Sequence, residues 1–185
     1  LIEANSTFDN DIIFNGAKAV TSVTSGGKAD LTINDMEAAA VVLNVAKAEG
    51  VEIDLSSSKS TALKELTINF AGDLEVDARN STGDSVTKLT VNVNGNGSFA
   101  EAEAEDEDTA DYLDFDDSSK LTSVVITGKG DLRLDLDGDD EVMTSFDATA
   151  LQGGVSSYLA SPTLASVKGG QGNDRLEIDQ LKEGG

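Results

Sequence analysis

Short stretches of alternating apolar and polar residues recur along this chain, and glycine turns follow many of them. The clearest example lies between Leu121 and Leu136, where two such stretches flank the turn Gly128–Asp131. In the second stretch Leu132 and Leu134 alternate with charged residues. A period of two gives each stretch one apolar face, so the pattern predicts two short β-strands around a turn.

The same pattern starts again at nearly even intervals. The start points are separated by 22, 21, 23, 35, 22 and 21 residues, and they are Val20, Val42, Leu63, Val86, Leu121, Met143 and Leu164. A two-strand unit repeating near 22 residues cannot bury its apolar face without a stacked neighbour. The spacing therefore predicts an all-β fold, a parallel β-solenoid of about seven coils. An antiparallel sandwich and a bacterial leucine-rich repeat are the alternative folds.

The repeat divides the chain into four parts. Residues 1–19, with the apolar-rich stretch Phe8–Phe14, are expected to form an entering cap strand, and residues 20–100 the first four coils. The one long step is explained by an acidic insertion over residues 101–117, which hold ten acidic residues and no basic one and are expected to form a solvated loop. The alternative is that Tyr112, Leu113 and Phe115 attach the end of this insertion to the body. Residues 118–185 form coils five to seven. A short helix beginning at Asn34 is an open alternative within the first coil.

Composition narrows the chemistry. The chain has no cysteine, histidine or tryptophan, which excludes disulfides, histidine-based catalysis and the usual zinc and copper sites. Its net charge of -22 disfavours nucleic acid and anionic lipid as partners and attracts cations. No apolar run is long enough to cross a bilayer, so membrane insertion is not expected. The chain begins without methionine, and we expect it to be a piece of a larger protein.

Acidic residues fall at one position of the repeat. When the coils are aligned on Val23, Val45, Leu66, Leu89, Val124, Phe146 and Val167, the residues seven places later are Asp30, Glu52, Asp73, Asn96, Asp131, Gly153 and Asp174. Carboxylates on coils about 4.8 Å apart repel each other, so such a column favours a bound cation. Asp30, Asp73 and Asp131 are therefore candidate metal ligands. The alternative is that these acids point into solvent.

A second candidate metal site lies at the end of the repeat unit Leu121–Leu136. Asp135, Asp137 and Asp139 alternate with other residues around Gly138, and Glu141 closes the segment. Alternating carboxylates around a glycine suit a hard cation with six to eight oxygen ligands. The segment is shorter than an EF-hand loop, so it is an acidic turn that is also a candidate calcium site.

The segment Gly169–Glu177 reads Gly-Gly-Gln-Gly-Asn-Asp-Arg-Leu-Glu and matches Gly-Gly-x-Gly-x-Asp-x-apolar-x at every fixed position. In this segment the chain resembles the RTX (repeats-in-toxin) family of calcium-binding β-rolls. The resemblance implies Ca²⁺ as the bound ion, Gly170, Gly172 and Asp174 as its ligands, and Leu176 as a core residue. It covers nine residues in one copy, whereas sites of this family lie between successive copies.

A looser resemblance extends from Val20 to Gly172. The Leu-Thr-Ser-Val-x-Ile-Thr-Gly-x-Gly pattern and the Thr-Ser-Phe-Asp-Ala-Thr-Ala-Leu-Gln-Gly-Gly pattern are similar to repeats of RTX-type bacterial surface-layer proteins. This resemblance implies export to the bacterial cell surface, Ca²⁺ binding and self-association into a lattice.

These observations together favour a calcium-binding structural domain of a secreted surface-layer protein rather than an enzyme. Cell-surface polysaccharide is a further expected partner. An RTX adhesin or biofilm-matrix module is the alternative among binding proteins. A carbohydrate-active β-helix is the alternative among enzymes, but basic and aromatic residues are sparse here.

Overall fold

The computed structural model describes residues 1–4, 11–26, 28–55, 63–78, 85–99, 110–115, 120–136 and 142–178. Within these ranges the regular structure is all β-strand, with no helix. The strands are β1 (Ile2–Ala4), β2 (Ile12–Phe14), β3 (Ser22–Ser25), β4 (Leu31–Ile33), β5 (Ala40–Asp54), β6 (Glu65–Asp77), β7 (Lys88–Val93), β8 (Asp111–Phe115), β9 (Ser123–Gly128), β10 (Leu132–Leu136), β11 (Ser145–Leu151), β12 (Val155–Leu159), β13 (Ser166–Lys168) and β14 (Arg175–Ile178).

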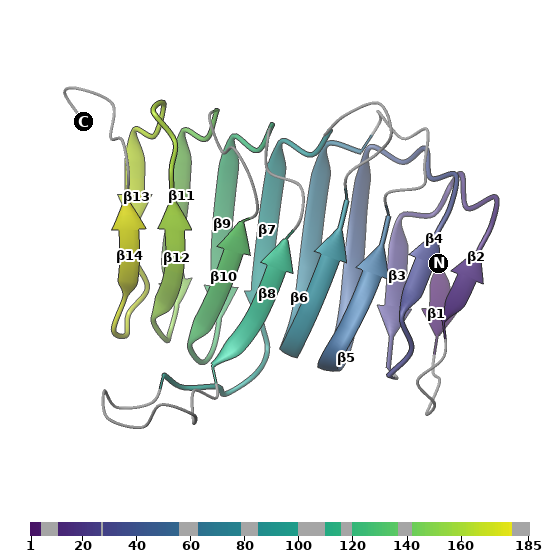
Figure 1. Ribbon diagram of the computed structural model, residues 1–185, viewed down its shortest axis with the longest axis horizontal. Coiled ribbons are helices and arrows are strands. Elements are labelled where there is room, and N and C mark those ends of the chain that lie inside the picture. The colour runs from purple at the N-terminus through teal and green to yellow at the C-terminus, as the bar shows by residue number, and fades with distance from the viewer. Residues whose placement is uncertain are drawn as a thin grey trace.

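The strands stack as a parallel β-solenoid with a repeat of about 23 residues, which confirms the predicted fold class. One row of strands, the first sheet, runs β1-β3-β5-β6-β7-β9-β11-β13, and the second sheet runs β2-β4-β5-β6-β8-β10-β12-β14. Figure 1 shows the two rows one behind the other along the long axis of the molecule. The long strands β5 and β6 belong to both sheets, so the two rows are joined in the middle of the solenoid.

The core lies between the two sheets and is built from inward rows of aliphatic side chains. Burial alternates along most strands, as in β10, where the leucines are buried and Arg133 and Asp135 are exposed. Residues in register on successive coils form continuous apolar ladders, and one of them runs Leu66, Leu89, Val124, Phe146, Val167. Burying a large apolar side chain contributes about 1.5–3 kcal/mol, so these ladders are the main stabilising feature of the fold.

The predicted alignment is correct from Leu66 to Val167 and wrong in the first two coils. Val41, not Val45, pairs with Leu66, and Val23 pairs with Leu43. A shift by an even number of residues leaves the same side chains on the inner face. Because apolar residues alternate throughout this stretch, the pattern alone did not fix the register there.

A polar ladder follows the outer face of the first sheet. Asn44, Asn69, Asn92 and Thr127 lie in register on β5, β6, β7 and β9. Asn69 Nδ2 donates to Asn44 Oδ1 at 2.7 Å, Asn92 Nδ2 donates to Asn69 Oδ1, and Thr127 donates to Asn92 Oδ1. Each side-chain amide thus hydrogen-bonds to the side chain on the next coil, and these bonds help to hold the register of the central coils.

The possible helix at Asn34 is not formed. Asp35 has a left-handed φ of 64°, and Met36 turns inward to 1% exposure. The backbone bonds here reach the preceding coil, with Ala17 N–H donating to the Asn34 carbonyl and Glu37 N–H donating to the Lys18 carbonyl. Because these groups bond to a neighbouring coil, they are not used within a helical turn.

The N-terminal segment is more than a cap strand. Strand β1 pairs with β3 and β2 pairs with β4, so residues 1–19 contribute a strand to each sheet, as the later coils do. The first part of the predicted strand Phe8–Phe14 lies outside the described residues. No helix in the described part of the chain is long and apolar enough to span a membrane.

The acidic insertion is corrected for its C-terminal part. Asp111–Phe115 is strand β8, which lies between β6 and β10 in the second sheet. Leu113 and Phe115 are fully buried. Their burial places this segment in the core, which agrees with the alternative that its apolar residues attach it to the body and contradicts the solvated loop expected from its acidity. Residues 101–109 and 116–117 lie outside the described residues.

Candidate functional site

Among the described residues, four aspartates occupy the corner at which the chain enters the second sheet. Asp30, Asp131 and Asp174 immediately precede β4, β10 and β14, and Asp111 is the first residue of β8. We call these residues the corner aspartates. Asp30 and Asp131 are followed directly by the buried Leu31 and Leu132, so core packing fixes their positions along the solenoid.

The corner aspartates accept hydrogen bonds from backbone N–H groups of adjacent coils. Asp111 Oδ1 accepts from Gly72 N–H at 2.7 Å. Asp131 accepts at both oxygens, from Gly154 N–H and from Phe99 N–H, at 2.7 Å each. Hydrogen bonds to an ionised acceptor are roughly twice as strong as neutral ones. Each of these carboxylates therefore ties one coil to another.

The other two corner aspartates make the same kind of contact near the two ends. Asp30 Oδ1 accepts from Glu52 N–H at 2.8 Å. Asp174 Oδ1 accepts from Val155 N–H and from Gly170 N–H at 3.0 Å each. The RTX-like segment Gly169–Glu177 is thus one instance of a bonding pattern that recurs along the solenoid.

Glycines make this close approach possible. A Cβ added to Gly95 would lie 2.1 Å from Asp111 Oδ2, and one added to Gly169 would lie 1.9 Å from Asp174 Oδ2. Both distances are far below any van der Waals contact. Gly95 and Gly169 are therefore required by the carboxylates packed against them.

Asp111 is the most buried of the four and was not among the candidate ligands. Its side chain is 5% exposed, and its Oδ2 atom has no hydrogen-bond partner among the described residues. Burial raises the pKa of this carboxyl, while the nearby N–H groups of Gly72 and Gly97 lower it by less. The site thus contains an oxygen that has lost its water without gaining a full set of partners.

A signal for Asp111 was present in the sequence. Leu113-Asp114-Phe115 repeats the alternation of Leu134-Asp135-Leu136, with which it is in register. Asp111 itself pairs with Leu132, an inward position. The many acidic residues around Asp111 obscured the strand pattern, so this inward position was not recognised in the sequence.

The remaining predicted ligands are dispersed. Asp73 pairs with Tyr112 within the second sheet, and Asp135 pairs with Asp114 on β8, so neither lies at the corner. Gly170 and Gly172 use their N–H groups, bonding to Asp174 and to the Gly153 carbonyl. Asp137 and Asp139 lie outside the described residues. Within the described ranges no group of three or more acidic side chains is placed to hold a metal ion.

Glu52, the predicted column member from the second coil, belongs to a different acidic region. It pairs with Glu75, and Asp54 pairs with Asp77, on the outer side of β5 and β6. We call these four residues the acidic face. Desolvation raises the pKa of Glu52, and the charges of Glu75, Asp30, Asp54 and Asp77 raise it further. A groove of about 200 Å³ lies beside it, lined by Asp11, Asp30, Glu52 and Asp54 among others.

Comparisons of the chain with protein-family models, with curated proteins and with solved structures found no match to any of them.

Proposed function

We propose that this solenoid is a non-catalytic, calcium-stabilised structural domain of an exported bacterial surface protein, and that it takes part in a surface-layer lattice. The observation that carries the proposal is the buried Oδ2 atom of Asp111, which has no hydrogen-bond partner among the described residues. It lies at a corner where carboxylates recur on neighbouring coils. A cation would supply the compensation that this oxygen lacks.

Calcium is the cation that fits this chemistry best. It is a hard ion that takes six to eight oxygen ligands in flexible geometry, whereas magnesium requires a tight octahedron. Asp111 and Asp131 would hold it, because they lie on neighbouring coils and the Asp111 N–H donates to the Asp131 carbonyl at 3.0 Å. Asp174 would act in the same way at the RTX-like turn. The bound ion would supply positive charge against a chain of net charge -22.

The structural role is supported by the shape and the stacking. A rod built of repeats in register presents long outer faces of one kind, which suits lateral assembly. The resemblance to RTX-type surface-layer repeats points the same way, and it also supports secretion and self-association. An adhesin or biofilm-matrix module is the second candidate, favoured by an outer groove described in the next subsection.

Thermal melting tests the calcium part of the proposal. We expect millimolar calcium to raise the melting temperature relative to chelator, because an ion that binds only the folded chain stabilises it by about 2.7 kcal/mol at a concentration of 100 Kd. Magnesium should do less. Electron microscopy of calcium-treated protein tests the lattice, which should appear as a periodic array.

Asp111→Asn is the matched variant. It keeps an oxygen to accept from Gly72 N–H and removes the charge. We expect it to melt like the parent in chelator and to lose most of the calcium response. Glu75→Gln, which removes a charge from the outer side of neighbouring β6, should keep that response. If the parent melts identically in calcium and in chelator, the corner aspartates act only as hydrogen-bond acceptors.

A further inference from the structure

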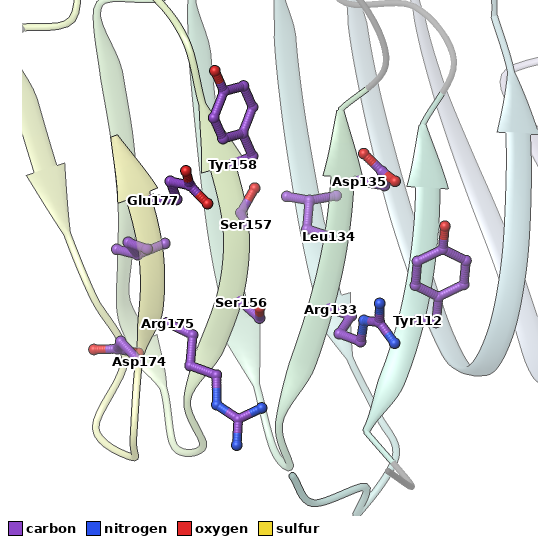
Figure 2. A pocket seen from close by; sticks show the side chains of 11 residues that line it. Tyr112, Arg133, Leu134, Asp135, Ser156, Ser157, Tyr158, Asp174, Arg175 and Glu177 are labelled. Atoms are coloured by element: carbon purple, nitrogen blue, oxygen red, sulfur yellow. The ribbon is translucent and has the colours of Figure 1, made fainter. Parts of the chain in front are cut away.

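A second hollow lies on the outer side of the second sheet, at the C-terminal end of the solenoid. It is a groove of about 540 Å³ lined by residues of β8, β10, β12 and β14. Figure 2 shows Tyr112 and Arg133 on one side, Arg175 and Glu177 of β14 on the other, and Ser156 and Tyr158 of β12 between them. Four successive strands contribute to it, so the groove runs across the strands along the solenoid axis.

A small residue between two large ones produces the hollow. Tyr112, Arg133, Ser156 and Arg175 are in register on the four strands. The two arginines are two strand spacings apart, roughly 10 Å. Ser156 leaves the space between them open. The volume lies within the range of sites that hold small molecules or segments of a polymer.

Aromatic rings hold the arginines in place. The Arg133 guanidinium lies 5.6 Å from the centroid of Tyr112, and that of Arg175 lies 4.9 Å from the centroid of Phe99. Each such contact contributes about 0.5–1 kcal/mol at an exposed site. The chain has only three arginines against 35 acidic residues, so two of them in one groove are a marked local concentration.

Hydrogen-bond acceptors lie beside these donors. Asp135, Tyr158 and Glu177 line the same groove, and Tyr158 is 49% exposed. The pKa of Tyr112 is raised to about 12, first by burial and then by the charge of Asp114, so its hydroxyl stays protonated. The groove thus offers guanidinium and hydroxyl donors, carboxylate acceptors and an exposed ring over a few strands.

The charges decide what kind of ligand fits. A polyanion would meet Asp135, Asp174 and Glu177 in the groove and a chain of net charge -22 around it. A polycation would meet two arginines. A neutral, hydroxyl-rich ligand both donates and accepts hydrogen bonds, so it uses the arginines and the carboxylates together. Its apolar ring faces can also lie against an exposed tyrosine.

We propose that this groove binds a neutral polysaccharide strand laid along the solenoid axis, with a sugar ring against Tyr158 and hydroxyl groups bonded to Arg133, Asp135 and Glu177. The proposal goes beyond the structural role, and the side chains that it assigns to the sugar are not the ones proposed to hold calcium. It gives the surface domain a specific attachment partner.

The test uses calorimetric titration of the whole chain with cellohexaose, maltohexaose and mannohexaose, and with hexagalacturonate as the acidic comparison. We expect at least one neutral hexasaccharide to bind, equally in calcium and in chelator, and more tightly than hexagalacturonate. Tyr158→Ala and Arg133→Ala should each weaken binding at least tenfold. Ser156→Tyr should abolish it by filling the hollow while leaving the arginines and carboxylates in place.

Ile13→Ala is the matched control, because Ile13 is a 60% exposed apolar residue on the outer side of β2 in the same sheet. It should bind like the parent, and circular dichroism should show that all four variants are folded.

The proposal is overturned if no neutral hexasaccharide binds, if hexagalacturonate binds more tightly, or if Ile13→Ala weakens binding as much as Tyr158→Ala. Concentration-dependent dimerisation abolished by Ser156→Tyr would assign the groove to a second copy of the chain instead. If the sugars bind although calcium does not change the melting temperature, the groove proposal holds and the calcium proposal fails.

Discussion

The corner aspartates and the acidic face use the same kind of side chain with opposite effects. At the corner, Asp131 accepts two backbone N–H groups from other coils, so its charge strengthens the stacking. On the acidic face, Glu52 pairs with Glu75 one strand away, and their charges oppose the stacking. In this solenoid an acid is therefore stabilising or destabilising according to whether it faces backbone N–H donors or another acid.

The largest expected loss of stability comes from removing the core packing next to the corner aspartates. Phe115 is fully buried in β8, the strand that begins with Asp111. Phe115→Ala should lower the free energy of unfolding by about 3–5 kcal/mol, because truncating a buried phenylalanine leaves a cavity. Urea denaturation measures the loss. An unchanged midpoint would show that β8 is not part of the core and that the acidic insertion extends over residues 101–117 as the sequence indicated.

A smaller change is expected from the corner carboxylate itself. Asp131→Ala should cost about 1–3 kcal/mol, because it leaves the N–H groups of Gly154 and Phe99 without an acceptor. Asp135 is an exposed residue of β10, the strand that follows Asp131. Asp135→Ala should change stability by less than about 0.5 kcal/mol. Equal losses from the two variants would remove the distinction between corner and surface acids.

The acidic face should show the smallest change, with the opposite sign. Glu52→Gln should stabilise the fold at neutral pH by up to about 0.5 kcal/mol, a value discounted for solvent screening. The folded-state pKa of Glu52 is raised, so the folded chain binds this proton more tightly, and stability falls as the pH rises from the unfolded pKa through the folded one. The gain should therefore be full above that window and absent at acid pH.

Melting of Glu52→Gln and the parent at several pH values and salt concentrations checks this result. Salt should reduce the difference, because the interacting charges are near the surface. A variant less stable than the parent at neutral pH would show that Glu52 has a stabilising partner and that the acidic face is not repulsive.

Much of the fold could be predicted, because equal spacing and period-two alternation constrain a parallel stack strongly. The ladder from Leu66 to Val167 follows directly from them. The position of Val41 could not, since a slip by four residues keeps every apolar residue inside. The possible helix at Asn34 rested on local propensity, which bonds to the preceding coil override.

The corner was predictable only in part. Asp30, Asp131 and Asp174 were identified from the acids that recur at one position of the repeat, and Asp174 also from the RTX-like segment. Asp111 was not, because its strand is embedded in acids and it occupies an inward position that leucine fills on the next coil. Tertiary burial, which composition does not report, is what makes this residue different.

The stacking offset gives the solenoid an uneven response to mechanical force. Ser123 is in register with Ser145 on one side and with Lys88 on the other, so successive coils differ by 22 residues in one step and by 35 in the next. A chain pulled from its two ends and peeled coil by coil would lengthen by roughly 75 Å for the shorter step and roughly 120 Å for the longer one. The longer step contains β8, so its full extension would require β8 to leave the second sheet in addition to breaking the bond from Thr127 to Asn92.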